Sequence, residues 1–205
     1  RKSVGMFDVS HMGEFFLEGA DAHKTIDYIM TNDYLSSPIG KAVYSPLCDD
    51  KGGMIDDAIG YKLSENKSLL CVNASNIEKD KAWVLKTIKN QGFQCEFTDS
   101  SEKFSLIALQ GPDSERILGK VWDTQLYNLG YYGVLQHDEF ILARTGYTGE
   151  DGFEIFGSHE EIKKLWIKLI ATGVVPCGLA ARDVLRLEVA YPLYGQDLNE
   201  NLTPL

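Results

Sequence analysis

The segment Gly52-Gly53-Met54-Ile55-Asp56-Asp57-Ala58-Ile59-Gly60-Tyr61-Lys62 carries a clear β-strand pattern that contains two adjacent aspartates. Its residues from Met54 to Lys62 alternate with a period of two, which predicts a β-strand. One face would carry Ile55, Asp57, Ile59 and Tyr61, and the other would carry Met54, Asp56, Ala58, Gly60 and Lys62. Asp57 therefore interrupts the apolar face, whereas Asp56 is expected on the more polar side. A buried carboxylate is costly unless it is paired or hydrogen-bonded, so Asp57 is either satisfied within the fold or kept for a ligand.

The next predicted strand, residues 68–73, carries a second polar exception. Asn73 shares a strand face with Leu69 and Cys71. A hairpin turning at residues 64–67 would bring Asn73 close to Asp57. An amide beside a carboxylate suits the polar edge of a planar heterocycle. The alternative is that Asn73 ends its strand and caps the following helix.

The remaining elements are mixed irregularly along the chain. There is no strict alternation of strands and helices, and no G-x-G-x-x-G or Walker sequence. This favours an α+β fold with mixed, largely antiparallel sheets and packed helices. Ser75 and Glu78 predict a capping box at the start of a helix over residues 75–91. We expect two lobes: residues 1–50 together with about 131–205, and residues from about 51 to 130.

Composition excludes several classes of protein. The chain has 205 residues, 44% of them hydrophobic, with 30 acidic and 20 basic side chains and a net charge of −10. These values are ordinary for a globular protein, and the acidic balance argues against a nucleic-acid binder. No run of 18 apolar residues occurs, so no membrane span is expected. The four cysteines have no C-x-x-C spacing, and neither a metal site nor secretion with disulfides is expected.

Two further places break the ordinary pattern. The glycine-rich stretch 145–152 would let the backbone approach a ligand, and Glu154 follows it. The alternative is a wide hairpin with a solvated Glu154. Arg182 lies in the first turn of the helix predicted after Gly178, where the helix dipole disfavours a cation. Its partner would be Asp183, Glu154 or the acid group of a ligand, unless Arg182 simply lies at the surface.

Several segments together match a known family in sequence order. They are Gly5-Met6-Phe7-Asp8-Val9-Ser10-His11-Met12, Gly52-Gly53-Met54-Ile55-Asp56-Asp57, Val72-Asn73-Ala74-Ser75-Asn76-Ile77-Glu78-Lys79-Asp80, Leu109-Gln110-Gly111-Pro112, Arg144-Thr145-Gly146-Tyr147-Thr148-Gly149-Glu150-Asp151-Gly152, Gly178-Leu179-Ala180-Ala181-Arg182-Asp183 and Leu193-Tyr194-Gly195-Gln196-Asp197. With these motifs the chain resembles the aminomethyltransferase (T-protein) family of the glycine cleavage system.

The resemblance implies a function. Enzymes of this family bind tetrahydrofolate, a co-substrate, in the middle of a three-domain cloverleaf. They take the aminomethyl group from the lipoyl arm of the H-protein, release ammonia and form 5,10-methylenetetrahydrofolate. The family's catalytic aspartate corresponds to Asp57. By the same resemblance, the folate-binding residues correspond to Asn73, Glu154, Arg182, Tyr44 and Tyr147.

The resemblance also sets expectations about what surrounds this chain. The family has a further N-terminal stretch and a C-terminal barrel domain, so we expect this chain to be a fragment. Its expected compartment is the cytoplasm in a bacterium or the mitochondrial matrix in a eukaryote. One alternative is a related folate enzyme, either a demethylase or the folate-binding half of a sarcosine or dimethylglycine dehydrogenase. Another is a non-enzymatic folate-binding protein of iron–sulfur cluster maintenance, although residues 189–197 lack that group's cysteine.

Overall fold

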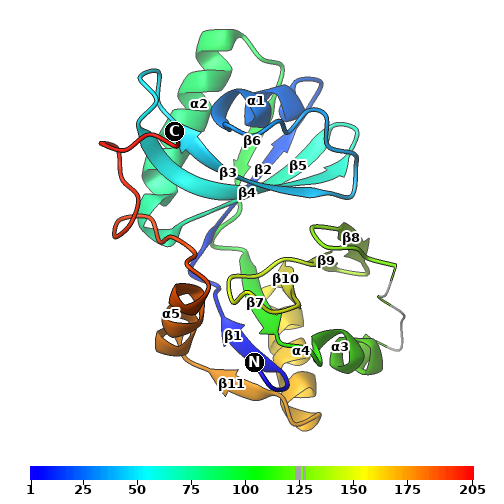
Figure 1. The fold of residues 1–205 in the computed structure, drawn as a ribbon. Coiled ribbons are helices and arrows are strands. Elements are labelled where there is room, and N and C mark those ends of the chain that lie inside the picture. Colours follow the sequence, from blue (N-terminus) through cyan, green and yellow to red (C-terminus); the bar gives the residue numbers. More distant parts are fainter. Residues whose placement is uncertain (123–125, 127) are drawn as a thin grey trace. The chain divides into compact units, whose positions relative to one another are not determined.

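The computed structural model describes residues 1–122, 126 and 128–205 (Figure 1). In chain order the elements are β1 (Gly5–Asp8), β2 (Gly13–Glu18), α1 (Ala22–Ile29), β3 (Ala42–Cys48), β4 (Met54–Ser64), β5 (Lys67–Val72), the 3₁₀-helix η1 (Ala74–Asn76), α2 (Ile77–Gln91), β6 (Glu96–Asp99), β7 (Phe104–Gln110), α3 (Ser114–Trp122), β8 (Val134–His137), β9 (Phe140–Ala143), β10 (Gly152–Ser158), α4 (His159–Ala171), β11 (Val175–Cys177) and α5 (Leu179–Glu188).

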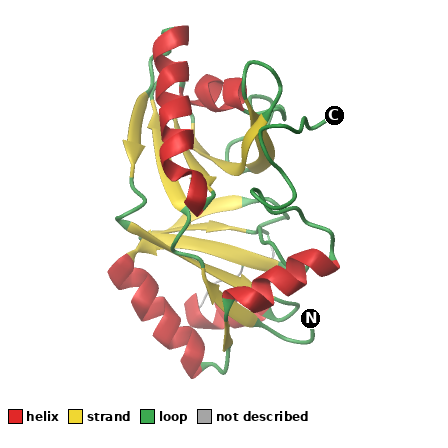
Figure 2. Ribbon diagram, turned by 90° about the vertical axis from the view of Figure 1, so that its left-hand side faces the viewer, coloured by secondary structure: helices red, strands yellow, loops and turns green. Residues whose placement is uncertain are grey.

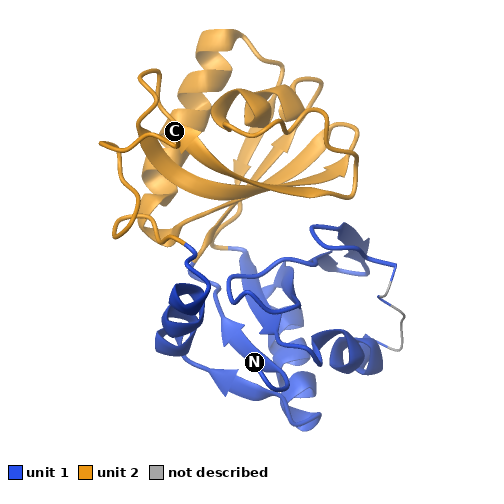
Figure 3. Cartoon of the chain, in the orientation of Figure 1, with its two compact units in different colours: residues 1–11, 103–191 blue, residues 12–102, 192–205 orange. Residues whose placement is uncertain are grey.

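Two compact units divide the chain (Figure 3). Unit 1 comprises residues 1–11 and 103–191, and unit 2 comprises residues 12–102 and 192–205. These boundaries differ from the two lobes expected from the sequence. Strands β2 and β3 belong to the same sheet as β4 and β5, so the segment they occupy lies in unit 2. Long-range strand pairing of this kind leaves no composition signal along the chain.

Unit 2 is built on an antiparallel sheet with the strand order β3-β4-β5-β2-β6. The predicted hairpin is confirmed, because β4 and β5 pair with Ile59 opposite Cys71 and Tyr61 opposite Leu69. Helices α1 and α2 cover one face of this sheet (Figure 2). Phe15, Leu17, Leu70 and Val72 extend from that face into the core.

The start of α2 differs from the sequence-based expectation. The helix begins at Ile77, and the residue before it, Asn76, is its N-cap. Ser75 lies instead in the 3₁₀ turn η1, so the expected capping box with Glu78 is absent. No side-chain hydrogen bond caps the helix, and the Asn76 side-chain nitrogen donates to Asp56 on β4. A tertiary contact therefore replaces the local capping interaction.

Unit 1 contains the second sheet, with the order β11-β1-β7-β10-β9-β8. Its strand pairs are antiparallel except for β1 and β11, which run parallel. Helices α3 and α4 pack on the face that carries Met6, Leu109 and Phe153. The chain is thus α+β with largely antiparallel sheets, as the sequence predicted. Strands β1, β8 and β11 have only three or four residues each, too few to show a reliable alternation in the sequence.

Among the described residues, none of the helices is both long and apolar enough to cross a bilayer.

Candidate functional site

Unit 2 brings together three of the residues proposed from the sequence. The Tyr44 hydroxyl on β3 donates a hydrogen bond of 2.8 Å to Oδ2 of Asp57 on β4. The Asn73 amide, directly after β5, donates to Oδ1 of the same carboxylate at 2.7 Å. Both carboxylate oxygens of Asp57 are therefore held, and they are held from two neighbouring strands. This arrangement fixes the orientation of a half-buried carboxylate.

Asp56, expected on the polar side of β4, is instead fully buried. Its Oδ1 accepts hydrogen bonds from the side-chain amides of Asn73 at 2.8 Å and Asn76 at 2.7 Å. Its Oδ2 accepts one from the backbone N–H of Asn73 at 3.2 Å. The expectation that Asp56 lies on the more polar side of β4 was wrong, because its face is covered by the helices. Asp57 lies on the opposite face, as expected.

Small side chains explain the error. Asp56 shares its strand face with Ala58 and Gly60, a face that resembles a solvated one in a hydropathy pattern. In the structure this face lies against α1 and the segment after it, so a Cβ at Gly60 would stand 2.8 Å from the ring of Tyr34. The small residues are required by close packing and do not mark exposure.

The electrostatics of Asp57 suit proton transfer. Burial raises the pKa of the Asp57 carboxyl above its ordinary value, and the negative charge of Asp56 raises it further. The hydrogen bonds from Tyr44 and Asn73 oppose this increase in the pKa, because they stabilise the ionised form. The result is a carboxylate that is a better proton acceptor than a solvated aspartate.

The side-chain nitrogen and the side-chain oxygen of Asn73 have different roles. Its Nδ2 donates to Asp56 and Asp57, including the backbone oxygen of Asp57 at 3.1 Å. Within the described part of the chain, no donor reaches its Oδ1. The side chain is thus locked by its nitrogen, and its oxygen remains able to accept a hydrogen bond. The alternative role of Asn73 as a helix cap is not realised, since its side chain makes no capping bond.

Unit 1 holds the other proposed residues, and Glu154 lies in the middle of its sheet. Its cross-strand neighbours are Ala108 on β7 and Ala143 on β9. The Glu154 side chain lies on the sheet face opposite α3 and α4. Its two cross-strand neighbours on that face have only methyl side chains. Glu154 is buried, and its Oε2 accepts a hydrogen bond of 2.6 Å from Thr145. The solvated alternative considered for this residue is therefore excluded.

Arg182 lies in the first turn of α5, as predicted. Its guanidinium lies 4.7 Å from the centre of the Tyr147 ring. The Tyr147 ring in turn stacks on Tyr191 at 5.9 Å between centroids. Asp183 pairs with Arg186 at 2.8 Å instead. The Nη1 atom of Arg182 is buried and has no hydrogen-bond partner among the described residues, which leaves a strong donor available.

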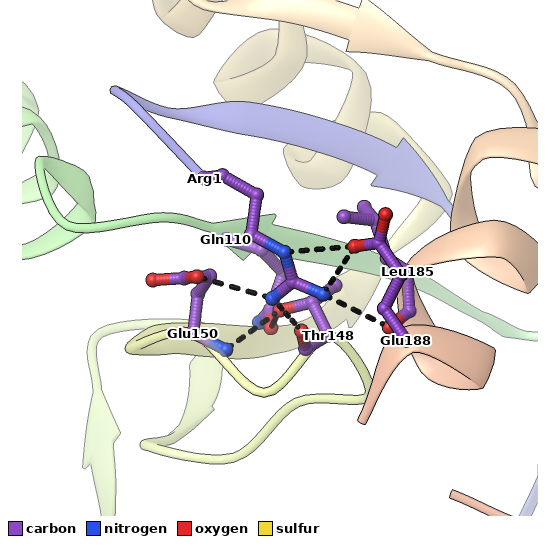
Figure 4. A network of polar contacts seen from close by, with 6 residues as sticks. All are labelled: Arg1, Gln110, Thr148, Glu150, Leu185 and Glu188. Carbon is purple, nitrogen blue, oxygen red and sulfur yellow. Dashed lines mark hydrogen bonds and ion pairs between the residues drawn. The ribbon is translucent and has the colours of Figure 1, made fainter. Parts of the chain in front are cut away.

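A network around Arg1 ties the glycine-rich loop to α5 (Figure 4). The Arg1 guanidinium donates to the backbone oxygens of Thr148 and Leu185. It also pairs with Glu150 at 3.0 Å and with Glu188 at 2.8 Å. One side chain therefore connects the two segments that carry the stacked tyrosine and the arginine described above.

Sequence reasoning missed three buried polar residues of unit 2: Glu14, Asn76 and Asp80. Asp80 could have been found, because it lies at positions i, i+4 and i+7 with Val84 and Thr87, both on the buried side of α2. Glu14 could have been found in the same way, because it lies between Met12 and Phe16 in the alternation of β2. In the described part of the chain, no group of three or more His, Cys, Asp or Glu side chains is arranged to hold a metal ion.

Glu14 gives the protein a predicted pH dependence. It is fully buried, and no donor in the described part of the chain reaches its carboxylate oxygens. Burial raises its pKa to about 8, with a further contribution from Asp99. The folded state therefore keeps a proton that the unfolded state loses above about pH 4.5. Stability contributed by this proton is lost as the pH rises towards about 8.

We expect Glu14→Gln to remove this loss. Between pH 5 and pH 8, the unfolding free energy of the wild type should fall by at least about 1 kcal/mol more than that of the variant. Urea denaturation across the pH range measures the difference. Glu18→Gln, at the exposed end of the same strand, is the control. Parallel curves for wild type and Glu14→Gln would contradict the prediction.

Comparison with known proteins supports the family resemblance. The family model described as the GCVT N-terminal domain matches residues 1–205. An aminomethyltransferase of Thermosipho melanesiensis is 46% identical over 210 residues, and one of Staphylococcus epidermidis is 45% identical over 209. Both alignments cover 100% of this chain and 57% of the relative. This chain therefore spans little more than half the length of these curated relatives.

Solved structures agree with the sequence comparison. The glycine cleavage system aminomethyltransferase T of Bartonella henselae superposes with a TM-score of 0.92 at 34% identity, over 100% of this chain and 56% of that one. Heterotetrameric sarcosine oxidase from Corynebacterium has a TM-score of 0.60 at 17% identity, which shows a shared fold alone. With a family match along its whole length and relatives at about 45% identity, the chain belongs to the aminomethyltransferase family, as a GCVT N-terminal domain.

Proposed function

We propose that this chain carries the catalytic aspartate and tetrahydrofolate-binding residues of a glycine cleavage aminomethyltransferase. The proposed reaction transfers the methylene carbon of an aminomethyl group, carried on the lipoyl arm of an H-protein, to tetrahydrofolate. The observation that carries the proposal is the fixed, half-buried Asp57, whose two oxygens are held by Tyr44 and Asn73. Family membership supports it further.

The chemistry needs a positioned proton acceptor. As the methylene carbon leaves sulfur and nitrogen, it forms bonds to N5 and N10 of the folate. The two folate nitrogens each lose a proton; one proton goes to the departing ammonia and the other to the lipoyl sulfur. A carboxylate with a raised pKa can accept and relay such a proton, and its charge offsets an iminium cation. We assign these roles to Asp57.

The other residues suit the polar edges of a folate. The free carbonyl oxygen of Asn73 can accept a hydrogen bond from a ring N–H. The Glu154 carboxylate can accept from the amino group and adjacent ring N–H of an aminopyrimidine. The unpartnered Nη1 of Arg182 suits a carbonyl or carboxylate oxygen of the same co-substrate. We propose Tyr44 and Tyr147 as aromatic neighbours of the folate.

Loss of either acceptor should weaken folate binding. We expect Asn73→Ala and Glu154→Ala each to raise the dissociation constant for tetrahydrofolate by about 5- to 150-fold, the equivalent of about 1–3 kcal/mol for a buried hydrogen-bonding group. Isothermal titration of the protein at its natural length measures this. Asn66→Ala and Glu160→Ala, both at exposed positions, are the matched controls. Unchanged affinity in both test variants would remove these residues from the binding site.

The function itself is tested by reconstitution. The protein at its natural length is mixed with aminomethyl-loaded H-protein and tetrahydrofolate, and released ammonia and methylenetetrahydrofolate are measured. We expect both products in equal amounts, and none when tetrahydrofolate is omitted from the methylene assay. Folate binding without transfer from the H-protein would contradict the proposed reaction.

A further inference from the structure

Two buried carboxyl groups meet beneath the sheet of unit 2. Asp56 on β4 and Asp80 in the first turn of α2 are both fully buried. Asp80 lies one helical turn after Asn76, whose side-chain amide donates to Asp56, and the electrostatic interaction between the two carboxyl groups raises the pKa of Asp80. Two ionised carboxylates packed together would repel strongly in a medium of low dielectric constant, so this arrangement requires a proton.

The surrounding donors decide which carboxyl carries the proton. Asp56 accepts three N–H hydrogen bonds, two from Asn73 and one from Asn76. Among the described residues, no donor reaches either oxygen of Asp80. A carboxylate that accepts several N–H groups is stabilised in its ionised form, whereas one without donors is not. The proton therefore resides on Asp80, and its O–H donates to Asp56.

The pair lies one contact away from the proposed catalytic carboxylate. The amide nitrogen of Asn73 that donates to Asp56 also donates to Asp57. Asp56 therefore sets the position of Asn73, and Asn73 orients Asp57. The charge of Asp56 additionally raises the pKa of Asp57. If Asp80 did not supply its O–H, Asp56 would lose one of its partners on the helix side and keep Asn76.

We propose that Asp80 is a positioning residue that holds a proton at neutral pH, donates it to Asp56, and through Asp56 and Asn73 fixes the geometry of Asp57. The location of the proton is independent of the reaction proposed above; only the effect on catalysis rests on that proposed function.

The charged groups around Asp80 are consistent with this assignment. Burial raises the pKa of Asp80 to about 10, and the contact with Asp56 and the more distant charge of Asp57 act in the same direction. Lys79, the neighbouring cation on α2, opposes them. Because the folded-state pKa is raised, the stability that this proton contributes is lost as the pH rises from about 4 towards about 10.

The proton is tested without any assay of activity. In protein labelled with ¹³C at the aspartate carboxyl, infrared spectra at pH 7 should show the C=O stretch of a neutral aspartic acid. We expect this band in the wild type and in Asp57→Asn, and we expect Asp80→Asn to abolish it. Absence of the band in the wild type, or its persistence in Asp80→Asn, would overturn the proposal.

The positioning role is tested by a graded series at the same residue. In Asp80→Asn the amide still donates to Asp56, so transfer should stay within about 3-fold of the wild type and become less sensitive to pH above 8. In Asp80→Ala the donor is gone, and the transfer rate should fall by about 10-fold or more with a smaller change in folate affinity. Thr87→Ala, at another buried position of α2 two helical turns beyond Asp80, is the control for disturbing the helix.

The outcomes separate the two proposals. Equal losses in Asp80→Asn and Asp80→Ala, or a loss of the same size in Thr87→Ala, would show that Asp80 acts only in packing and would overturn the positioning role. If the wild type itself failed to transfer, the proposed function would fail, while the infrared result would still decide the location of the proton.

Discussion

Asp57→Asn is expected to lower the rate of aminomethyl transfer by about 10²-fold or more while the protein stays folded. Asn is nearly the same size as Asp and can still accept from Asn73, so the packing of β3 and β4 should be retained. What Asn lacks is the proton acceptor and the negative charge. Removing a desolvated charge should leave the thermal stability equal or slightly higher.

The measurement is single-turnover transfer from aminomethyl-loaded H-protein, with thermal melting as a check on folding. Glu14→Gln is the matched control, because it also removes a buried carboxyl from the same face of the same sheet. We expect the control to transfer within about 3-fold of the wild type at pH 7. Transfer by Asp57→Asn at the wild-type rate would show that the carboxylate has no catalytic role.

Asp56→Ala is expected to lower the free energy of unfolding by about 3 kcal/mol or more. Asp56 is not one of the residues proposed to contact a substrate. The variant would leave the backbone N–H of Asn73 and the side-chain amide of Asn76 without their acceptor inside the protein, and the Asn73 side-chain amide would keep only its bonds to Asp57. Each unsatisfied buried polar group costs about 1–3 kcal/mol, and water entering the small cavity recovers part of this. Asp80 would also lose the proposed acceptor of its proton.

Urea denaturation measures the loss, and Asp50→Ala at an exposed position of the same unit is the control. Asp56→Asn should fall between the two, because its carbonyl oxygen still accepts while one acceptor position is lost. A stability equal to that of the control would mean that the buried amide network contributes little.

The local sequence pattern was sufficient to predict the β4–β5 hairpin and the proximity of Asn73 to Asp57 that it creates. Strands β4 and β5 are separated by a tight turn, so the pairing of Ile59 with Cys71 follows from their own alternation and carries Asn73 to Asp57. Motifs placed Glu154 and Arg182 on the correct elements as well. The hairpin joins residues that are close in the sequence, and the placement of Glu154 and Arg182 depends on one strand and one helix. A periodic pattern contains information of both kinds.

The tertiary structure alone decided which of the two adjacent aspartates is enclosed. A hydropathy pattern assigns small residues such as Ala58 and Gly60 to neither side, but helix packing selects that face because only small residues allow a close approach. The same packing sets Asp80 against Asp56, a contact between a helix and a strand that neither segment specifies by itself. The unit boundaries had the same origin, since β2 joins the sheet of unit 2 through pairing with β5 and β6. Burial depends on which other parts of the chain pack over a residue. The sequence by itself therefore determined the strands and the polar residues that interrupt them. Only the packed structure determined which of these polar residues are enclosed and which remain accessible.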